Sequence, residues 1–300
     1  MKIDVGLARP EFPKTLYRFL SPSGKLEENE MKFWPDLENA IHKQRHYMAS
    51  LSQQNDPFEA RPSFTRSKFK NIRDYLRRFE ATFGKGRSFT GTDIASELQA
   101  RGVTAKHYQN LVGHSLEVAK NVSKIVHAPS FARRATKIKC FSEEWTNLLM
   151  WSHYGNGHQG ICLCYNVDGT QIHRIGPVQV DYVTERPKLS TVEMMEFVGH
   201  ARLKHENAQF FDTDRTTKTF EKLFLTKAKD WAYEKEWRIS HIDDDPPGYR
   251  DTPGMKVVEI LVGKNADAKL LTELQTRHGH HVKITQLKLD NDKFALCPKC

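Results

Sequence analysis

Two glutamates and one arginine alternate near residue 236, in a segment that could do chemistry or form an ion pair. Residues 231–238 read WAYEKEWR, so that Glu234, Glu236 and Arg238 are each two positions apart. On a β-strand these three side chains share one face. A carboxylate there can orient a sugar hydroxyl or stabilise an oxocarbenium-like centre. The alternative is an ion pair between Glu236 and Arg238, which contributes little if it is exposed.

Tyr17 and Arg18 form a second candidate, inside the segment LYRFL at residues 16–20. We expect this segment to be the first strand. A guanidinium group suits a bidentate grip on phosphate or carboxylate, which makes Arg18 a candidate anion ligand. A surface arginine without a ligand is the alternative.

The segment NDPFE at residues 55–59 carries two carboxylates next to a turn. Asn55 and Asp56 precede a proline, and their side chains can shape the turn. The functional interpretation instead places Asp56 or Glu59 beside a ligand hydroxyl or a basic partner.

Large aromatic and imidazole side chains crowd residues 140–165, CFSEEWTNLLMWSHYGNGHQGICLCY. The pattern predicts a strand, a short helix and a second strand, and Trp151, His153 and Tyr154 at such a junction suit the wall of a pocket. A core histidine beside a packed tryptophan is the alternative. His153 and His158 are five residues apart, which does not match the helical spacing of zinc proteases. We therefore expect no metal there.

Hydrophobic periodicity predicts an α+β chain whose strands position these candidates. Helices are expected at residues 36–44, 192–231 and 267–278. Strands are expected at residues 16–20, 46–51, 137–141, 160–165, 178–183, 236–241, 257–262 and 282–289. The acidic, proline-rich segment at residues 243–254 is expected to be a solvated loop.

Residues 64–132 are expected to form a helical insert within a single domain of residues 1–300, because apolar residues recur there three and four apart. The net charge of the chain is +9, and much of the excess lies at residues 61–85 and 133–139. Such basic clusters are either solvated faces or contacts to nucleic acid.

Composition favours a soluble globular protein, with 38% hydrophobic and 28% charged residues. We find no run of about 18 apolar residues and no apolar core of a secretory signal, so we expect a cytoplasmic protein that does not enter a membrane. The 5 cysteines are too few for a disulfide framework. Cys297 and Cys300 in the terminal CPKC supply only half of a zinc knuckle, and we predict no metal site.

The motifs LYRF, NDPFE, CFS…LLMWSHYGNGHQGICLCY and WAYEKEWRI together resemble a bacterial family designated domain of unknown function 2971. Their order and spacing agree from residue 16 to residue 290, and the stretch at residues 67–127 is the least similar. The designation of that family implies no activity by itself.

The layout of the motifs also resembles ADP-ribosyltransferases of the DNA-targeting toxin type. This resemblance implies a mixed central sheet of the ADP-ribosyltransferase type, with NAD as the substrate. It implies that Arg18 and Glu236 are catalytic and that Trp151 and Tyr154 flank the nicotinamide. The remaining candidate NAD contacts are Tyr17, Ser50 with Ser52 as its near alternative, Asn55, Asp56, Glu59 and His153. Arginine replaces the histidine often found at the first position, and the long insert is a further departure.

The resemblance leads us to expect an NAD-dependent ADP-ribosyltransferase or NAD glycohydrolase that acts on a nucleic acid or a protein. Toxin action or antiviral defence is the expected setting, with an antitoxin or another defence protein as partner. Two alternatives stay open. The basic clusters indicate a non-enzymatic nucleic-acid-binding or sensor module. Asp56, Glu59 and His153 could instead serve a metal-dependent nuclease.

Overall fold

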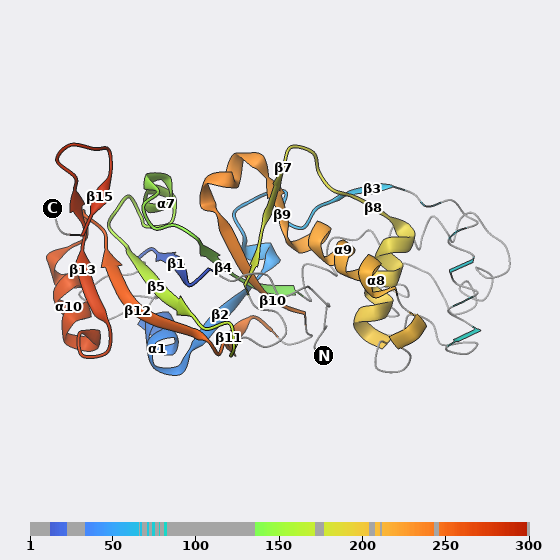
Figure 1. Ribbon diagram of the computed structural model, residues 1–300, viewed down its shortest axis with the longest axis horizontal. Coiled ribbons are helices and arrows are strands. Elements are labelled where there is room, and N and C mark those ends of the chain that lie inside the picture. Colours follow the sequence, from blue (N-terminus) through green and yellow to red (C-terminus); the bar gives the residue numbers. More distant parts are fainter. Residues whose placement is uncertain are drawn as a thin grey trace.

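The computed structural model describes residues 13–22, 34–65, 67, 71, 74, 75, 78, 81, 82, 136–171, 177–203, 208–210, 212–242 and 246–298. The expected helical insert at residues 64–132 and the basic cluster at residues 61–85 lie largely outside these ranges. The described residues combine helices and strands around a mixed central sheet (Figure 1).

The largest described sheet has nine strands, in the order β11-β2-β4-β1-β5-β12-β13, with β10 paired to β4 and β6 paired to β10. Only β12 and β13 run parallel, and the other pairs are antiparallel. Its strands are β1 (Thr15–Leu20), β2 (Arg45–Ser50), β4 (Thr136–Ser142), β5 (Ile161–Val167), β6 (Val178–Gln179), β10 (Glu236–Ile242), β11 (Gly248–Asp251), β12 (Met255–Val262) and β13 (Lys283–Gln286). The central strand β5 exposes only Asn166, as its apolar run predicts.

Helices cover both faces of this sheet. On one face α1 (Trp34–Lys43) and α10 (Ala268–His278) pack onto a core that includes Leu37 and Leu274. The short α7 (Leu148–His153) contributes Met150 and Trp151 to a separate core cluster on the other face (Figure 1).

A second group of elements extends the molecule to one side of the central sheet (Figure 1). Helices α8 (Thr191–Leu203) and α9 (Thr213–Phe224) pack together there around Phe197, Phe220 and Phe224. The remaining short elements of the described chain are distributed over both parts of the molecule. They are β3 (Ser63–Thr65), β7 (Asp181–Val183), β8 (Lys188–Ser190), β9 (Thr226–Ala228), β14 (Lys288–Leu289), β15 (Leu296–Cys297) and the 3₁₀ turns η2 (Leu51–Gln53), η3 (Ala208–Phe210) and η4 (Lys229–Glu234).

Strand β4 is the element that creates space for a site. One edge of β4 pairs with β10 along its whole length. Its other edge pairs with β2 at residues 137 and 138, and with β1 only at Ser142. The two neighbouring strands therefore diverge along residues 139–141, and they leave that edge of β4 open.

The alternation of β4 sends its side chains to two different environments. Phe141 packs with Trp237 in the core beneath α1. On the opposite face, Cys140 and Ser142 lie across from Arg238 and Glu236 in the register of β10.

The expected strands at residues 16–20, 46–51, 137–141, 160–165, 236–241 and 257–262 are confirmed, as are the helices at residues 36–44 and 267–278. The prediction of a loop at residues 243–254 was wrong in part, because residues 248–251 form strand β11, which pairs with β2. The expected helix at residues 192–231 is interrupted by β9, which pairs with β7. No helix in the described ranges is long and apolar enough to cross a membrane.

Candidate functional site

A cavity of about 200 Å³ opens where β1 and β2 diverge from β4. It is bounded by β1, β2, β4, the loop after β2, the end of α7, and the junction of η4 with β10. We call Glu234 and Glu236 the acidic wall of this cavity, and Arg18 and Lys139 its cationic wall. Tyr17, Asn55 and Tyr154 lie among the neutral lining residues.

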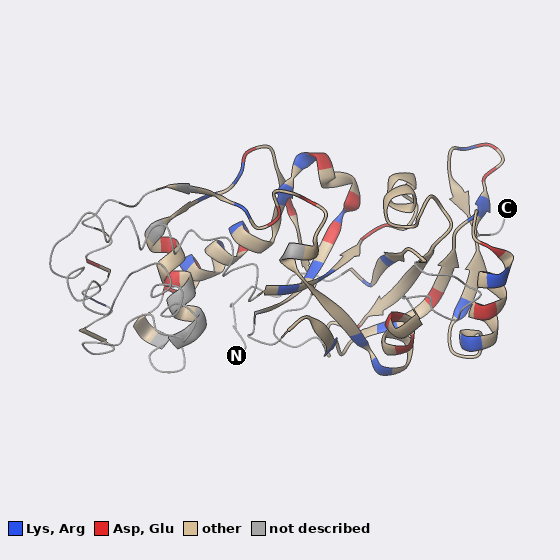
Figure 2. Cartoon of the chain, turned by 180° about the vertical axis from the view of Figure 1, so that it is seen from behind, with Lys and Arg blue, Asp and Glu red and all other residues tan. Residues whose placement is uncertain are grey.

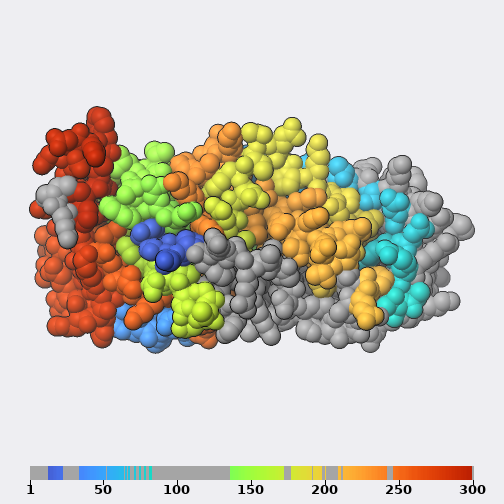
Figure 3. Space-filling model, viewed as in Figure 1, coloured from blue at the N-terminus to red at the C-terminus, as the bar shows by residue number. Residues whose placement is uncertain are grey.

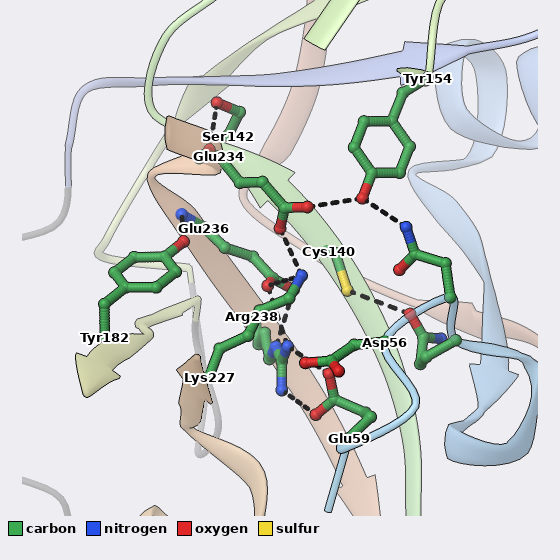
Figure 4. Close-up of polar contacts among 12 residues, drawn as sticks. Asp56, Glu59, Cys140, Ser142, Tyr154, Tyr182, Lys227, Glu234, Glu236 and Arg238 are labelled. Atoms are coloured by element: carbon green, nitrogen blue, oxygen red, sulfur yellow. Dashed lines mark hydrogen bonds and ion pairs between the residues drawn. The ribbon is translucent and has the colours of Figure 1, made fainter. Parts of the chain in front are cut away.

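Glu236 is fixed by a two-point ion pair with Arg238 on the same strand (Figure 4). Arg238 Nε lies 2.7 Å from Oε1 of Glu236, and Nη2 lies 2.9 Å from Oε2. Lys227 Nζ adds a contact of 3.3 Å to Oε2. Burial opposes ionisation, but Arg238 and Lys227 lower the pKa of Glu236 to about 2. Glu236 is therefore a permanent carboxylate at neutral pH.

Arg238 uses every donor of its guanidinium group inside the protein. Its Nη1 donates to Glu59 Oε1 and to the main-chain oxygen of Phe224, each at 2.7 Å, and its Nη2 donates to Glu59 Oε2 at 2.9 Å. With 1% of its surface exposed, Arg238 is the fixed counter-ion of two glutamates and has no donor left for a ligand.

Glu234 has a different environment from Glu236. The hydroxyl of Tyr154 donates to its Oε1 at 2.5 Å, and Lys227 forms an ion pair with its Oε2. Three carboxylates, Glu59, Glu234 and Glu236, share only two cations in this network. Burial and the neighbouring Glu236 raise the pKa of Glu234, although Lys227 opposes them. The acidic wall therefore pairs one permanently ionised carboxylate with one that protonates more readily, as in enzymes that divide acid and base roles.

The short helix α7 positions Tyr154. Asn147 caps its start by accepting from the amide of Leu149 at 2.8 Å. Gly155 follows Tyr154, and a Cβ atom there would lie 2.7 Å from the main-chain oxygen of Trp151. The phenol hydroxyl is held by Glu234 (Figure 4) and by Asn55, whose Nδ2 donates to it at 2.8 Å. Burial and Glu234 raise the pKa of Tyr154.

The cationic wall forms no ion pair with a carboxylate among the described residues, although Asp36 lines the same cavity. Arg18 Nη1 donates to the main-chain oxygen of Cys140 at 2.8 Å, on the open edge of β4, while its buried Nε has no hydrogen-bond partner in the described chain. Lys139 is 4% exposed, and its Nζ makes no hydrogen bond or ion pair with any described residue. Burial and then Arg18 hold the pKa of Lys139 well below its usual range, although Asp36 opposes this. Burial, Lys139 and Arg18 likewise lower the pKa of His46. This wall can accept an anion.

The structure brings five of the predicted site residues to the cavity lining: Tyr17, Arg18, Asn55, Tyr154 and Glu236. Trp151 and His153 are not among the lining residues. Trp151 is fully buried against Phe19, with ring centroids 5.1 Å apart, and its indole nitrogen donates to the main chain of Trp145. His153 is exposed, with its ring 6.2 Å from that of Tyr233. Aromatic residues in this helix thus serve the core as well as the cavity.

Two of the remaining predicted residues, Asp56 and Glu59, shape the loop after β2. The carboxylate of Asp56 accepts from the amide of Phe58 at 2.8 Å, and Glu59 is held by Arg238. The amide of Ser50 is bonded to Gln53, outside the cavity lining, and the side chain of Ser52 lies outside the described atoms. Asp56 and Glu59 therefore position the loop that carries Asn55.

Sequence reasoning missed two cations of the site, Lys139 and Lys227. The cluster at residues 133–139 was interpreted as a basic face, but Lys137 and Lys139 are both buried. These two lysines therefore do not belong to a surface charge patch. In Figure 2 basic and acidic residues are interspersed over the described part of the chain. Residues 137–141 read KIKCF, so that Lys139 lies between the apolar residues Ile138 and Cys140 of a predicted strand. This position within an apolar segment was the available sign that Lys139 is buried.

Residues 150–239 match the model of a family described as a protein of unknown function (DUF2971). The matched segment carries Tyr154, Lys227, Glu234, Glu236 and Arg238, which are the acidic wall and its hydrogen-bond partners. No curated protein and no solved structure matches the chain.

The terminal CPKC is described only in part. Cys297 is disulfide-bonded, and Cys300 lies outside the described residues. The sulfur of Cys297 is therefore not a free thiolate for zinc in this structure.

Proposed function

We propose that this protein cleaves the bond between nicotinamide and ribose in NAD and transfers the ADP-ribose to water or to a nucleic-acid or protein acceptor. The observation that carries this proposal is one cavity with two carboxylates of different pKa on one wall and two unpaired cations on the other. The acidic wall suits a developing ribose cation, and the cationic wall suits a phosphate.

The size of the cavity limits what it can enclose. Pockets that bury a drug-sized ligand measure about 300–1,000 Å³. The volume here is about 200 Å³, which matches a ribose with one attached phosphate better than a whole dinucleotide. The adenosine half of NAD would then lie outside the cavity.

The reaction follows from the charges on the two walls. The C1′–N bond breaks, its electron pair moves to the pyridinium nitrogen, and neutral nicotinamide leaves. The positive charge that develops on the ribose is stabilised by the permanent carboxylate of Glu236. The acceptor oxygen then attacks C1′ and transfers its proton to Glu234, whose raised pKa suits it to act as a base.

A second candidate function is binding of a phosphorylated ligand without chemistry, as in a sensor module. It is favoured by the ion pairs of Glu236 with Lys227 and Arg238, which reduce the negative charge that Glu236 can offer to a developing ribose cation. A nuclease is less well supported, because Glu59 is neutralised by Arg238 and His153 is exposed on α7.

Nicotinamide release from NAD, followed by chromatography, tests the proposal. Wild type should release nicotinamide, and Glu236→Gln should release it at least 100-fold more slowly, since loss of one group that stabilises developing charge costs about 10²–10³ in rate. Glu144→Gln is the matched control, because Glu144 forms an exposed ion pair with Lys235. NAD binding without release would favour the sensor, and neither binding nor release would contradict both functions.

A further inference from the structure

Helices α1 and α10 bring three metal-ligating side chains together, away from the lining of the cavity. Glu38 and His42 are four residues apart on α1 and so share one face of the helix. His278 is the last residue of α10. One donor atom from each of these three residues lies within 4.8 Å of the other two. Figures 1 and 3 show α1, in blue, beside the orange-red C-terminal segment.

His278 is the most informative member of this cluster. It is fully buried, and neither of its ring nitrogens has a hydrogen-bond partner among the described residues. Its Nε2 lies 3.7 Å from Oε1 of Glu38, beyond hydrogen-bond distance. A buried imidazole without partners destabilises the fold unless something else satisfies its nitrogens.

The surroundings favour a cation ligand over water alone. The neutral imidazole is the form that coordinates a metal. The carboxylate of Glu38 lies 3.5 Å from Nε2 of His42, so that an anionic oxygen and two imidazoles face one point.

We propose that Glu38, His42 and His278 bind a divalent transition metal of the zinc type, which clamps α1 to α10. Nitrogen and carboxylate oxygen are ligands that Zn²⁺ takes at about 2.0–2.2 Å, so tetrahedral ligands lie about 3.3 Å apart. Small side-chain rotations would close the present separations to that value. Glu38 and His42 are 47% and 33% exposed, which gives an ion access from solvent.

A further imidazole lies next to the cluster, although it is not one of the three residues whose donor atoms lie within 4.8 Å of one another. The ring of His281 lies edge-on to that of His42, with centroids 4.6 Å apart. His281 or a water molecule can complete the tetrahedron. The clamp does not depend on the function proposed for the cavity.

Isothermal titration of Zn²⁺ into the full-length, chelator-treated protein tests the proposal. Wild type should bind one equivalent, and His42→Ala should bind at least tenfold more weakly, because a ligand is lost. His280→Ala is the matched control, since His280 is an exposed neighbour outside the cluster, and it should bind like wild type. Because His42 is partly exposed, its removal should leave the fold intact.

Two further measurements keep the outcome unambiguous. Co²⁺ should give the visible absorption of a tetrahedral site in wild type and not in His42→Ala. Zn²⁺ should raise the Tm of wild type and leave that of His42→Ala unchanged. Equal affinity of wild type, His42→Ala and Glu38→Gln would overturn the site. So would a loss of binding in Cys297→Ser, which would assign the ion to the C-terminal tail.

Discussion

On the acidic wall of the cavity, Glu236 forms ion pairs with Arg238 and Lys227. On the cationic wall, Lys139 forms no ion pair with a carboxylate among the described residues, although Asp36 lines the same cavity. Glu234, Glu236 and Lys139 are each exposed by 4% or less, and Arg18 is half-buried. In the first arrangement every carboxylate has a cation as partner, which supports the fold. The second leaves charge unsatisfied, which costs stability and is useful only when a ligand supplies the missing partner.

Removal of Arg238, the cation that forms ion pairs with Glu59 and Glu236, should have the largest effect on stability. Arg238→Met leaves Glu59 buried without its counter-ion and Glu236 with Lys227 alone, and we expect a loss of about 3–5 kcal/mol in the free energy of unfolding. Urea denaturation monitored by circular dichroism measures it. Lys235→Met removes an exposed ion pair with Glu144 and should cost less than about 1 kcal/mol. Similar costs for the two variants would mean that burial of the network does not matter.

Removal of the unpaired cation should act in the opposite direction. Lys139→Met replaces a buried lysine that forms no ion pair among the described residues by an apolar side chain of similar length. Because burial of an unpaired charge destabilises the folded state, we expect the free energy of unfolding to stay the same or to increase. The same urea denaturation applies. A clear loss of stability would show that Lys139 has a structural partner and that the two walls do not differ.

The pH dependence of stability should separate wild type from Lys139→Met. The pKa of Lys139 is lower in the folded state than in the unfolded state, so the unfolded chain binds more protons between those two values. Wild-type stability should therefore rise relative to Lys139→Met as pH increases towards about 10.4, by at most about 1.4 kcal/mol per pH unit. Denaturation curves at pH 8, 9 and 10, above the range of His46, measure this slope, and parallel curves would contradict it.

The smallest effect concerns the hydroxyl group that links the acidic wall to the loop after β2. Tyr154→Phe removes one hydrogen bond to Glu234 and one from Asn55. The ring stays in place, so we expect a loss of about 1–2 kcal/mol. Asn55→Ala, measured in the same way, should cost less, because Glu234 keeps its tyrosine partner. A larger loss of stability in Asn55→Ala than in Tyr154→Phe would mean that the hydrogen bond to Asn55, and not the one to Glu234, is the more important contact of Tyr154.

The central strands were predictable because their signal is local. The apolar run of β5 and the alternation in β1 and β10 each reflect burial of the strand itself. The short β11 was not predictable, since its residues follow two prolines and its partner β2 lies about 200 residues earlier.

The candidate site was predictable only where a residue type has one common use. Arg18 and Glu236 were expected in one site because arginine suits a phosphate and glutamate suits a ribose cation. Tyr154 was expected beside them because the resemblance to ADP-ribosyltransferases places it against the nicotinamide. Trp151 was assigned to the pocket because an aromatic side chain has the same spacing pattern whether it fills a core or lines a cavity. Lys139 was missed because lysines in a basic run are usually solvated. Its burial at the cavity depends on β1 and β2 diverging beside β4, which the sequence does not reveal.

Titration of ADP-ribose, which has no nicotinamide bond left to cleave, into wild type and Lys139→Met by isothermal calorimetry tests the central claim most directly. If the unpaired cations hold the phosphate of a nucleotide, Lys139→Met should bind about 10- to 100-fold more weakly, as expected for one lost charge-assisted hydrogen bond. Lys235→Met should bind like wild type. Equal affinity of wild type and Lys139→Met would contradict the assignment of the cationic wall to a phosphate.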